Sequence, residues 1–195
     1  PFTDSQILGI STFPYSLKDF FLEGTQQVSA SWITLENLSF PYCISINSSY
    51  IYEQSTDERI NQNDAAITLA HELGHYLGLR HVFSEGGTTS MCTDTDYCKD
   101  TPSYNRSEYE QWLNNLDKQN KYQLKDLAKR YSCEKGEYEA HNIMDYAYCF
   151  YNEITLEQRK RIRHILNYSP LIPGPKESRI DTRGVQGRLN LPICI

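Results

Sequence analysis

Eleven residues near the middle of the chain constrain it more than any other segment, because they place three imidazoles, a carboxylate and two glycines at helical spacing. The segment spans residues 71–81 and reads HELGHYLGLRH. His71 and His75 are four residues apart, so on a helix both side chains leave the same face and can bind one metal ion. Gly78 can take the left-handed conformation that ends a helix, which lets His81 supply a third nitrogen from beyond it. Three histidines with an open fourth position are typical of a catalytic zinc site.

Glu72 directly follows the first predicted ligand, where a carboxylate acts as a general base and not as a ligand. It can take a proton from the water that zinc activates and carry it to a leaving amine. This pattern predicts zinc-dependent hydrolysis of peptide bonds. A zinc amidase or deacylase would use the same groups, and a binding protein on an inactive scaffold is a further alternative. The intact Glu72 argues against an inactive scaffold.

Three regions show helical signals. The helix that carries the first two histidines is expected to start at Asn63 or Asp64, which are good N-cap residues, and to run to Leu77. One or two surface helices are expected within residues 106–131, and a final helix begins at a capping box at Thr155. Apolar residues of the first helix repeat every three or four positions and predict a buried stripe, with the ligands facing a cleft. The stripe comprises Ala66, Leu69, Leu73, Tyr76 and Leu77.

Further motifs follow the histidine segment in a characteristic order. The chain reads HVF at 81–83, DTP at 100–102 and HNIMDY at 141–146. Together with the zinc motif, these segments resemble the metzincin metallopeptidases, and more narrowly their pappalysin family, over roughly residues 64–166. The resemblance implies an α+β fold of the zincin, metzincin-like type. Such a catalytic domain has two lobes: a small twisted sheet with the active-site helix above, and an irregular lower lobe with a C-terminal helix.

The same resemblance implies a division of the chain. The catalytic domain would span 1–170, with an upper lobe at about 1–81 and a lower lobe at about 82–170. Residues 171–195 are rich in proline and glycine and are expected to form an extended tail. Only 70 residues precede His71, fewer than in metzincin upper lobes, which fits either a compact variant or a truncated upper lobe.

The resemblance also assigns roles around the predicted metal. Met144 would form the hydrophobic floor of the Met-turn beneath the zinc, and Tyr146 would stabilise the oxyanion or act as a further ligand. The chain that follows, residues 147–151, would line the pocket for the residue after the scissile bond. Because this stretch is aromatic and holds no carboxylate before Glu153, a preference for hydrophobic side chains is expected there.

Three segments have strand character. Residues 5–13 and 28–35 are β-prone, and 42–52 alternates isoleucines with polar residues. In metzincins, the edge strand upstream of the zinc helix pairs with extended substrate by strand addition. The resemblance therefore suggests this role for 42–52, and an ordinary sheet strand is the alternative.

An acidic loop follows the histidine segment and concentrates carboxylates and hydroxyls between residues 93 and 102. Hard oxygen donors of this kind suit Ca²⁺. Pappalysin-like enzymes bind calcium near this region, and the matching residues are Asp96, Asp100 and Thr101. A loop that is merely solvated is the alternative, because no EF-hand spacing is present.

The chain holds six cysteines without a Cys-x-x-Cys pair, which argues for disulfides over a structural metal, with free buried thiols as the alternative. Sequence alone leaves the connectivity open. By analogy with the family, we expect two bridges between the zinc helix and the final helix, and a third that pins the tail to the upper lobe. These pairs are Cys92–Cys133, Cys98–Cys149 and Cys43–Cys194.

Composition limits the partners and the compartment. A net charge of −6 and a pI near 5.4 argue against nucleic acid, and no apolar run is long enough to span a membrane. We expect a monomer that acts on proteins or peptides. The cysteines indicate an oxidising compartment, so a secreted, periplasmic or cell-surface protein is expected. Pro1 is not preceded by a leader in this chain, so an export signal or pro-segment would have been removed or left out.

Overall fold

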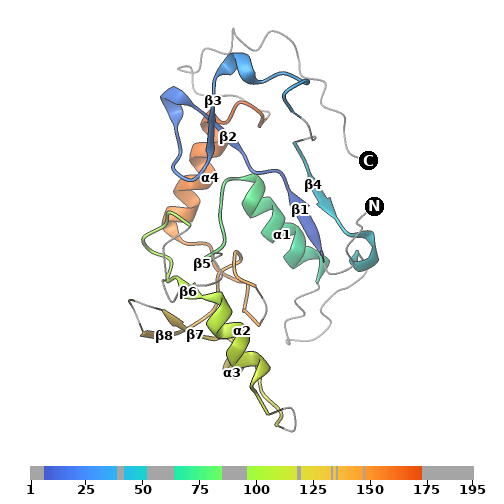
Figure 1. Cartoon of the computed structure of the whole chain (residues 1–195), viewed down its shortest axis with the longest axis vertical. Coiled ribbons are helices and arrows are strands. Elements are labelled where there is room, and N and C mark those ends of the chain that lie inside the picture. The colour runs from blue at the N-terminus through green and yellow to red at the C-terminus, as the bar shows by residue number, and fades with distance from the viewer. Residues whose placement is uncertain are drawn as a thin grey trace.

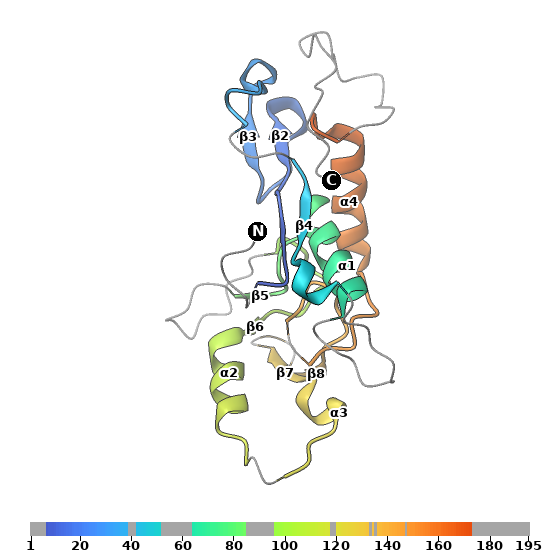
Figure 2. The same ribbon diagram turned by 90° about the vertical axis from the view of Figure 1, so that its right-hand side faces the viewer.

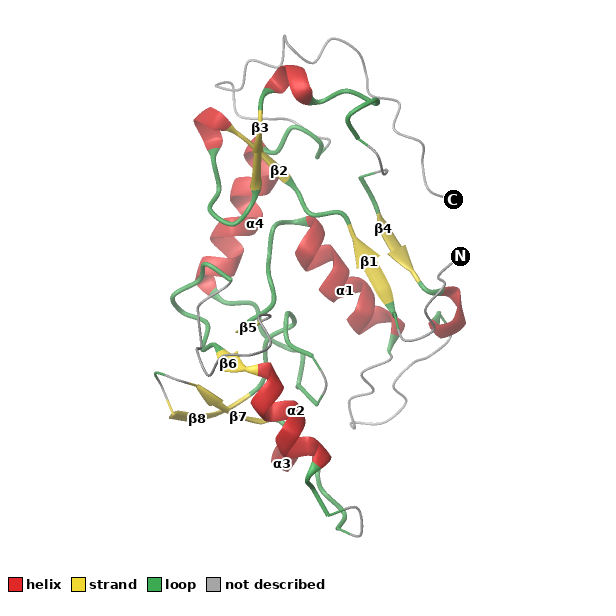
Figure 3. Cartoon of the chain, viewed as in Figure 1, coloured by secondary structure: helices red, strands yellow, loops and turns green. Residues whose placement is uncertain are grey.

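A central helix, α1 (Ala65–Tyr76), lies between paired strands on one side and the C-terminal helix α4 (Leu156–Tyr168) on the other (Figures 1 and 2). This computed structural model describes residues 7–38, 42–51, 64–84, 96–117, 120–132, 134, 136–146 and 148–172. The molecule is elongated, and a four-stranded sheet lies below α1 (Figure 3). This arrangement agrees with the expected α+β, metzincin-like fold.

Two pairs of short strands build the upper half. Strand β1 (Gly9–Ser11) is antiparallel to β4 (Ile44–Ile46), and β2 (Tyr15–Leu17) is parallel to β3 (Gln26–Val28). Two 3-10 turns lie between these strands in the chain, at Lys18–Phe20 and Ala30–Trp32, and a third at Ser48–Tyr50 follows β4. The prediction of strands in 5–13 and 42–52 is confirmed in part. Among the described residues of these segments, the three residues of β1 pair with the three residues of β4. The prediction for 28–35 is wrong beyond Val28, because a 3-10 turn capped by Ser29 follows.

The lower half holds a four-stranded sheet whose strands lie side by side in the order in which they occur in the chain. Its strands are β5 (Phe83–Ser84), β6 (Tyr104–Asn105), β7 (Lys129–Ser132) and β8 (Gly136–Glu139), of which only the first two pair in parallel. Helix α2 (Arg106–Asn114) leaves β6 directly, and the single turn α3 (Leu124–Leu127) precedes β7. The expectation of one or two surface helices within 106–131 is therefore confirmed by α2 and α3.

Local capping explains where the two long helices begin. The side chain of Asp64 accepts hydrogen bonds from the backbone N–H groups of Ala66 and Ile67 and so starts α1. Thr155 and Gln158 bond reciprocally at the start of α4, which is the expected capping box. Both starts were readable in the sequence because a cap depends on residues that are neighbours in the chain.

The main apolar cluster joins the upper strands to α4 and to the residues that follow it. It comprises Val28, Ile33, Tyr42, Ile165, Leu171 and Ile172. The last two residues belong to the segment expected as an extended tail, and both are buried. The rest of that segment, 173–195, lies outside the described residues. No described helix is both long and apolar enough to cross a bilayer.

The predicted buried stripe of α1 is wrong for Ala66, Leu69 and Leu73, which are exposed. Tyr76 and Leu77 are partly buried and pack against the main apolar cluster. Leu69 and Leu73 are 49% and 43% exposed, whereas the buried residues of this helix are Thr68, His71, Glu72 and Gly74. The pattern assumed that the apolar residues point inward and that the ligands face a cleft. In the structure, the lower half of the molecule covers the ligand face, so His71 and Glu72 become buried while His75 and His81 stay partly exposed.

Candidate metal centre

Three histidine nitrogens meet beside the C-terminal half of α1. The Nε2 atoms of His71 and His75 are 3.1 Å apart, and the Nε2 atom of His81 lies 3.2 Å from the first and 3.0 Å from the second. The first two residues occupy one face of α1. The third follows Gly78, whose φ of +86° takes the left-handed turn that the motif predicts. Among the described residues, this is the only cluster of side chains suited to a metal ion.

The second nitrogens of two rings show which tautomer is present. Nδ1 of His71 lies 2.8 Å from the carbonyl oxygen of Ile143, and Nδ1 of His75 lies 2.9 Å from that of Leu79. A carbonyl only accepts, so each Nδ1 carries the hydrogen and each neutral ring has its lone pair on Nε2. Lone pairs that face one another at about 3 Å repel, and a shared cation removes that repulsion. The site therefore fits zinc bound through three Nε2 atoms, with the outer hydrogen bonds fixing the rings.

Burial keeps the site in the protonation state that a metal ligand needs. Burial and the neighbouring imidazoles lower the pKa of His71 to about 3, so its ring is neutral at physiological pH. Burial also raises the pKa of the adjacent Glu72 to about 7. A carboxyl with a pKa in this range can both accept and return a proton near neutral pH.

The Met-turn supports the helix from below. Met144 is fully buried, and its Sδ atom packs against Gly74 of α1. A Cβ at Gly74 would collide with this sulfur, so the close packing needs glycine here. The following Asp145 is also buried. Its carboxylate accepts hydrogen bonds from the Tyr104 hydroxyl and from the Tyr146 N–H, and it pairs with the Arg130 guanidinium. This network holds the backbone of the turn in place.

Tyr146 lies beside the histidines, where the resemblance predicted it. Its ring centroid is 4.5 Å from that of His81 and 5.4 Å from that of His71, and its side chain is 37% exposed. The guanidinium of Arg106 lies over the same ring, 4.6 Å from its centroid. The tyrosine is thus placed by packing, with part of its surface open to the site.

A pocket of about 560 Å³ opens next to the first histidine and the glutamate. Its apolar lining includes Ile7, Leu8, Tyr50, Ile67 and Tyr151. Arg106 and Glu110 also line it, joined by a 2.6 Å ion pair along α2. Sequence reasoning expected only a surface helix in this region and missed its contribution to the pocket, although the i, i+4 spacing of opposite charges was visible.

Of the predicted pocket wall at 147–151, only Tyr151 lines this pocket. Cys149 is buried, Phe150 stacks on His141, and residue 147 lies outside the described residues. Tyr148 and Tyr151 both have positive φ, so the backbone turns sharply at each end of this stretch and sends successive side chains in different directions.

The strand that passes the candidate base is β1, whereas sequence reasoning pointed to 42–52. A Cβ built on Gly9 would lie 2.7 Å from Cγ of Glu72, so the strand and the carboxylate are in direct contact. Asn47 donates to the Leu8 carbonyl and Thr12 donates to the Cys43 carbonyl, so the even-numbered residues of β1 bond to β4. By strand alternation, the N–H and C=O groups of Gly9 and Ser11 point to the opposite edge.

The predicted calcium ligands bind other protein groups. The carboxylate of Asp96 accepts hydrogen bonds from the Cys98 N–H and the Thr101 hydroxyl. The carboxylate of Asp100 accepts hydrogen bonds from the Thr155 hydroxyl and the Glu157 N–H at the start of α4. These oxygens organise the loop and cap a helix, so the calcium prediction is not supported.

Two of the expected disulfides are absent. Cys98 and Cys149 are free thiols, and Cys43 is in no disulfide, which contradicts the pairs Cys98–Cys149 and Cys43–Cys194. Cys98 and Cys149 are buried in separate hydrogen-bonded turns, next to the carbonyls of Asp96 and Asn142 respectively, and burial raises each thiol pKa to about 12. The alternative of free buried thiols holds for these residues. The pair Cys92–Cys133 lies outside the described residues.

Comparisons with known proteins point in the same direction as the geometry. The peptidase family model described as Pregnancy-associated plasma protein-A matches residues 32–167. Extracellular metalloproteases of Arthroderma benhamiae and Trichophyton verrucosum are each 37% identical over 108 residues, which cover 54% of this chain and 32% of each relative. A third, from Arthroderma otae, has the same identity and 33% coverage. The chain spans about a third of the length of these relatives. No solved structure matches it significantly.

Proposed function

The chain belongs to the Pregnancy-associated plasma protein-A family of peptidases, the pappalysins, and from this premise we propose that it is a zinc-dependent endopeptidase. The observation that carries the proposal is the convergence of three Nε2 atoms within 3.2 Å, directly beside a buried glutamate. The zinc ligands would be His71, His75 and His81. Because the matched relatives are described as extracellular metalloproteases, we extend the proposal to an extracellular protein that acts on proteins or peptides.

A zinc ion at this site would supply a Lewis acid that acidifies water and polarises the scissile carbonyl. The chain supplies the proton transfers. The Glu72 carboxylate takes the proton of the attacking water and then delivers it to the nitrogen of the leaving amine. The hydroxyl of Tyr146 donates a hydrogen bond to the oxygen on which negative charge develops. Met144 supports the ligands from below without binding the metal.

Substrate would bind as an extended strand along the outward edge of β1. The backbone groups of Gly9 and Ser11 point to this edge, and Gly9 lies against the proposed base. Main-chain hydrogen bonds of this kind hold a peptide regardless of its sequence. This assignment replaces 42–52 as the substrate-binding strand, because β1 lines the pocket at Glu72 and β4 does not.

The pocket beside Glu72 would receive the side chain that follows the scissile bond. Its lining is apolar at Ile7, Leu8 and Ile67 and carries charged groups elsewhere. Two of these charges, on Arg106 and Glu110, neutralise each other, and the Asp145 carboxylate pairs with the Arg130 guanidinium. The preference for hydrophobic residues expected from the sequence therefore remains our proposal, with the lining supplied by Ile67 and Tyr151 and by the start of β1.

Metal content and turnover test the proposal together. The purified protein should contain about one zinc ion and cleave casein or a quenched peptide, and chelation should abolish cleavage reversibly. Glu72→Ala should retain zinc and lose at least about 10² in kcat, because the base is not a ligand. Tyr146→Phe should lower kcat more than it raises KM, since the hydroxyl acts mainly in the transition state. Retained turnover in Glu72→Ala would exclude this mechanism.

A further inference from the structure

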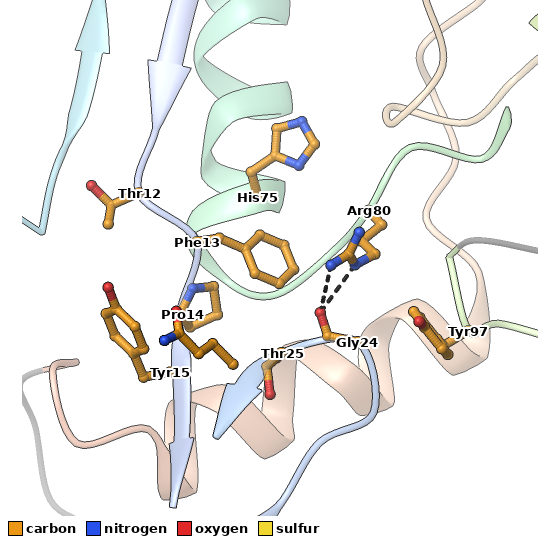
Figure 4. A pocket seen from close by; sticks show the side chains of 10 residues that line it. Thr12, Phe13, Pro14, Tyr15, Gly24, Thr25, His75, Arg80 and Tyr97 are labelled. Atoms are coloured by element: carbon orange, nitrogen blue, oxygen red, sulfur yellow. Dashed lines mark hydrogen bonds between the residues drawn. The ribbon is translucent and has the colours of Figure 1, made fainter. Parts of the chain in front are cut away.

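A second pocket, of about 760 Å³, opens on the other side of the three histidines. Figure 4 shows its lining: the segment Thr12–Pro14 that follows β1, the loop at Gly24, and the side chains of His75, Arg80 and Tyr97. The pocket thus begins at a proposed metal ligand and extends away from Glu72. Nothing in the proposed chemistry uses it.

Arg80 is the charged residue of this pocket, and the structure holds it firmly. Its Nε and Nη2 atoms donate to the carbonyl of Gly24 at 3.1 and 2.7 Å, as the dashed lines in Figure 4 show. Its guanidinium carbon lies 5.2 Å from the ring centroid of Phe13 and 5.8 Å from that of Tyr97. Gly24 has a φ of +82°, and a Cβ there would lie 2.4 Å from the Tyr97 ring, so glycine is needed for this arrangement.

The charge of Arg80 has no counter-ion among the described residues. None of the ion pairs that they form includes this residue, and its two hydrogen bonds go to a neutral carbonyl. The carboxylate of Asp96 bonds to the Cys98 N–H and the Thr101 hydroxyl. A second cation, Arg161, lies 5.6 Å from the Tyr97 ring centroid. The guanidinium edge that does not face Gly24 can therefore take an incoming carboxylate in a bidentate pair.

The position of the proposed base tells which part of a substrate reaches this pocket. The leaving amine belongs to the residue after the scissile bond, and Glu72 must reach it, so the pocket lined by Glu72 takes the carboxyl-side residues. The Arg80 pocket lies beyond His75 and takes the amino-side residues. The chain at β1 runs from the Glu72 pocket toward the Arg80 pocket. A substrate paired antiparallel to β1 runs the opposite way, so its amino-side residues lie at the Arg80 pocket and its carboxyl-side residues at the Glu72 pocket.

We propose that Arg80 makes this peptidase select substrates that carry an acidic side chain on the amino side of the scissile bond. The inference rests on the proposed function and names a specificity determinant for it. Aromatic rings of Phe13 and Tyr97 flank the guanidinium, so the carboxylate would be bound in a partly dehydrated setting where a charge-assisted hydrogen bond contributes more than on an open surface.

Matched peptides test the proposal. Quenched peptides that differ only by Glu, Gln or Lys, placed in turn at each of the three positions before the cut, are compared by kcat/KM. For the wild type, Glu should exceed Gln on the order of tenfold at one position, as expected for a hydrogen bond to a charged group. Arg80→Gln should bring this ratio to about one, and Arg80→Glu should favour Lys. Arg80→Lys should keep part of the preference.

Because Arg80 precedes a proposed ligand, zinc content is measured for every variant and should stay near wild type. The Glu-to-Gln ratio is taken within each variant, so a change in overall turnover cancels. Arg163→Gln, an exposed arginine on α4, is the control for the change in net charge and should keep the wild-type ratio. The proposal is overturned by a Glu-to-Gln ratio near one in the wild type, or by an unchanged ratio in Arg80→Gln. A preference for aromatic side chains before the cut that is the same in the wild type and in Arg80→Gln would also overturn it.

A binding measurement separates the two levels of inference. Affinities of the same Glu and Gln peptides for the zinc-loaded Glu72→Ala protein are measured by fluorescence anisotropy, without turnover. If no peptide is cleaved by the wild type, the proposed function fails. The ratio of the two dissociation constants then still decides whether Arg80 recognises an acid, with a ratio near one counting against it.

Discussion

The Glu72 side chain rests directly on the backbone of Gly9, so the proposed base is positioned by a residue that has no side chain of its own. A Cβ at this position would approach Cγ to 2.7 Å and Oε1 to 3.0 Å, distances that Cβ atoms do not tolerate. The carboxylate is buried against this strand, and burial raises its pKa to about 7. Its position thus depends on the close approach of this backbone, and its basicity on its burial.

Gly9→Ala is expected to displace the carboxylate from its catalytic position. We predict a loss of kcat of about 10² with zinc content unchanged, because a shift of about 1 Å in a catalytic group has an effect of this size. Ser11→Ala, two residues along the same strand, is the matched control and should retain activity. Full activity in Gly9→Ala would mean that Glu72 moves aside without consequence.

At the scale of elements, the start of α4 links three distant segments. The carboxylate of Asp100 accepts hydrogen bonds from the Thr155 hydroxyl and the Glu157 N–H, and Gln158 exchanges two hydrogen bonds with the side chain of Asn142 in the Met-turn. The helix N-terminus therefore anchors both the loop after the histidine motif and the turn beneath the metal. The predicted calcium ligand serves as part of this cap.

Asp100→Ala should lower the free energy of unfolding by about 1 kcal/mol near neutral pH, as expected for the loss of a helix cap. Burial raises the pKa of Asp100, but the hydrogen bonds from Glu157 and Thr155 outweigh it and hold the pKa below its ordinary value of 3.8. A lowered folded pKa means that the stabilisation is present above 3.8 and is lost as pH falls through the folded value.

Urea unfolding of the wild type and Asp100→Ala at neutral and strongly acidic pH measures this directly. The difference between the two proteins should shrink at the acidic pH. Asp19→Ala, which removes an exposed carboxylate in another part of the chain, is the control and should match the wild type at both pH values. A difference that grows with acidification would contradict the assigned role.

Across the whole molecule, the metal centre joins the upper and lower halves. His71 and His75 come from α1, while the hydrogen bond from His71 Nδ1 reaches the carbonyl of Ile143 in the lower half. Met144 packs beneath Gly74. Arg161 of α4 adds a second connection, since its guanidinium donates to the carbonyls of Gly78 and Glu23.

Removal of zinc should therefore destabilise both halves together. With zinc at about a thousandfold excess over its dissociation constant, binding stabilises the fold by about 4 kcal/mol, and a chelator should remove this stabilisation and lower Tm. Hydrogen exchange should increase at 79–83 and 141–146, and added zinc should reverse both effects. His81→Ala should respond weakly to zinc. Equal Tm values with and without chelator would contradict this coupling.

Sequence reasoning succeeded where the signal is local. The boundaries of α1 and α4 follow from caps at Asp64 and Thr155, and the left-handed turn at Gly78 follows from the motif itself. It failed where the outcome depends on what packs against a residue. Leu69 and Leu73 have the periodicity of a core stripe, yet they are exposed because the covered face of the helix is the one with the histidines.

The sequence by itself grouped the three proposed zinc ligands with the proposed base, because spacing along a helix sets which side chains share a face. The Met-turn was implied by the family resemblance, and local caps marked where the helices start. Only the tertiary structure decided that β1 and not 42–52 passes the base, that Cys98 and Cys149 remain apart, and that Asp100 caps α4. It also placed Arg80 in a pocket beside the metal centre. These outcomes join residues that are far apart in the chain, and no local pattern encodes which distant partner a side chain meets.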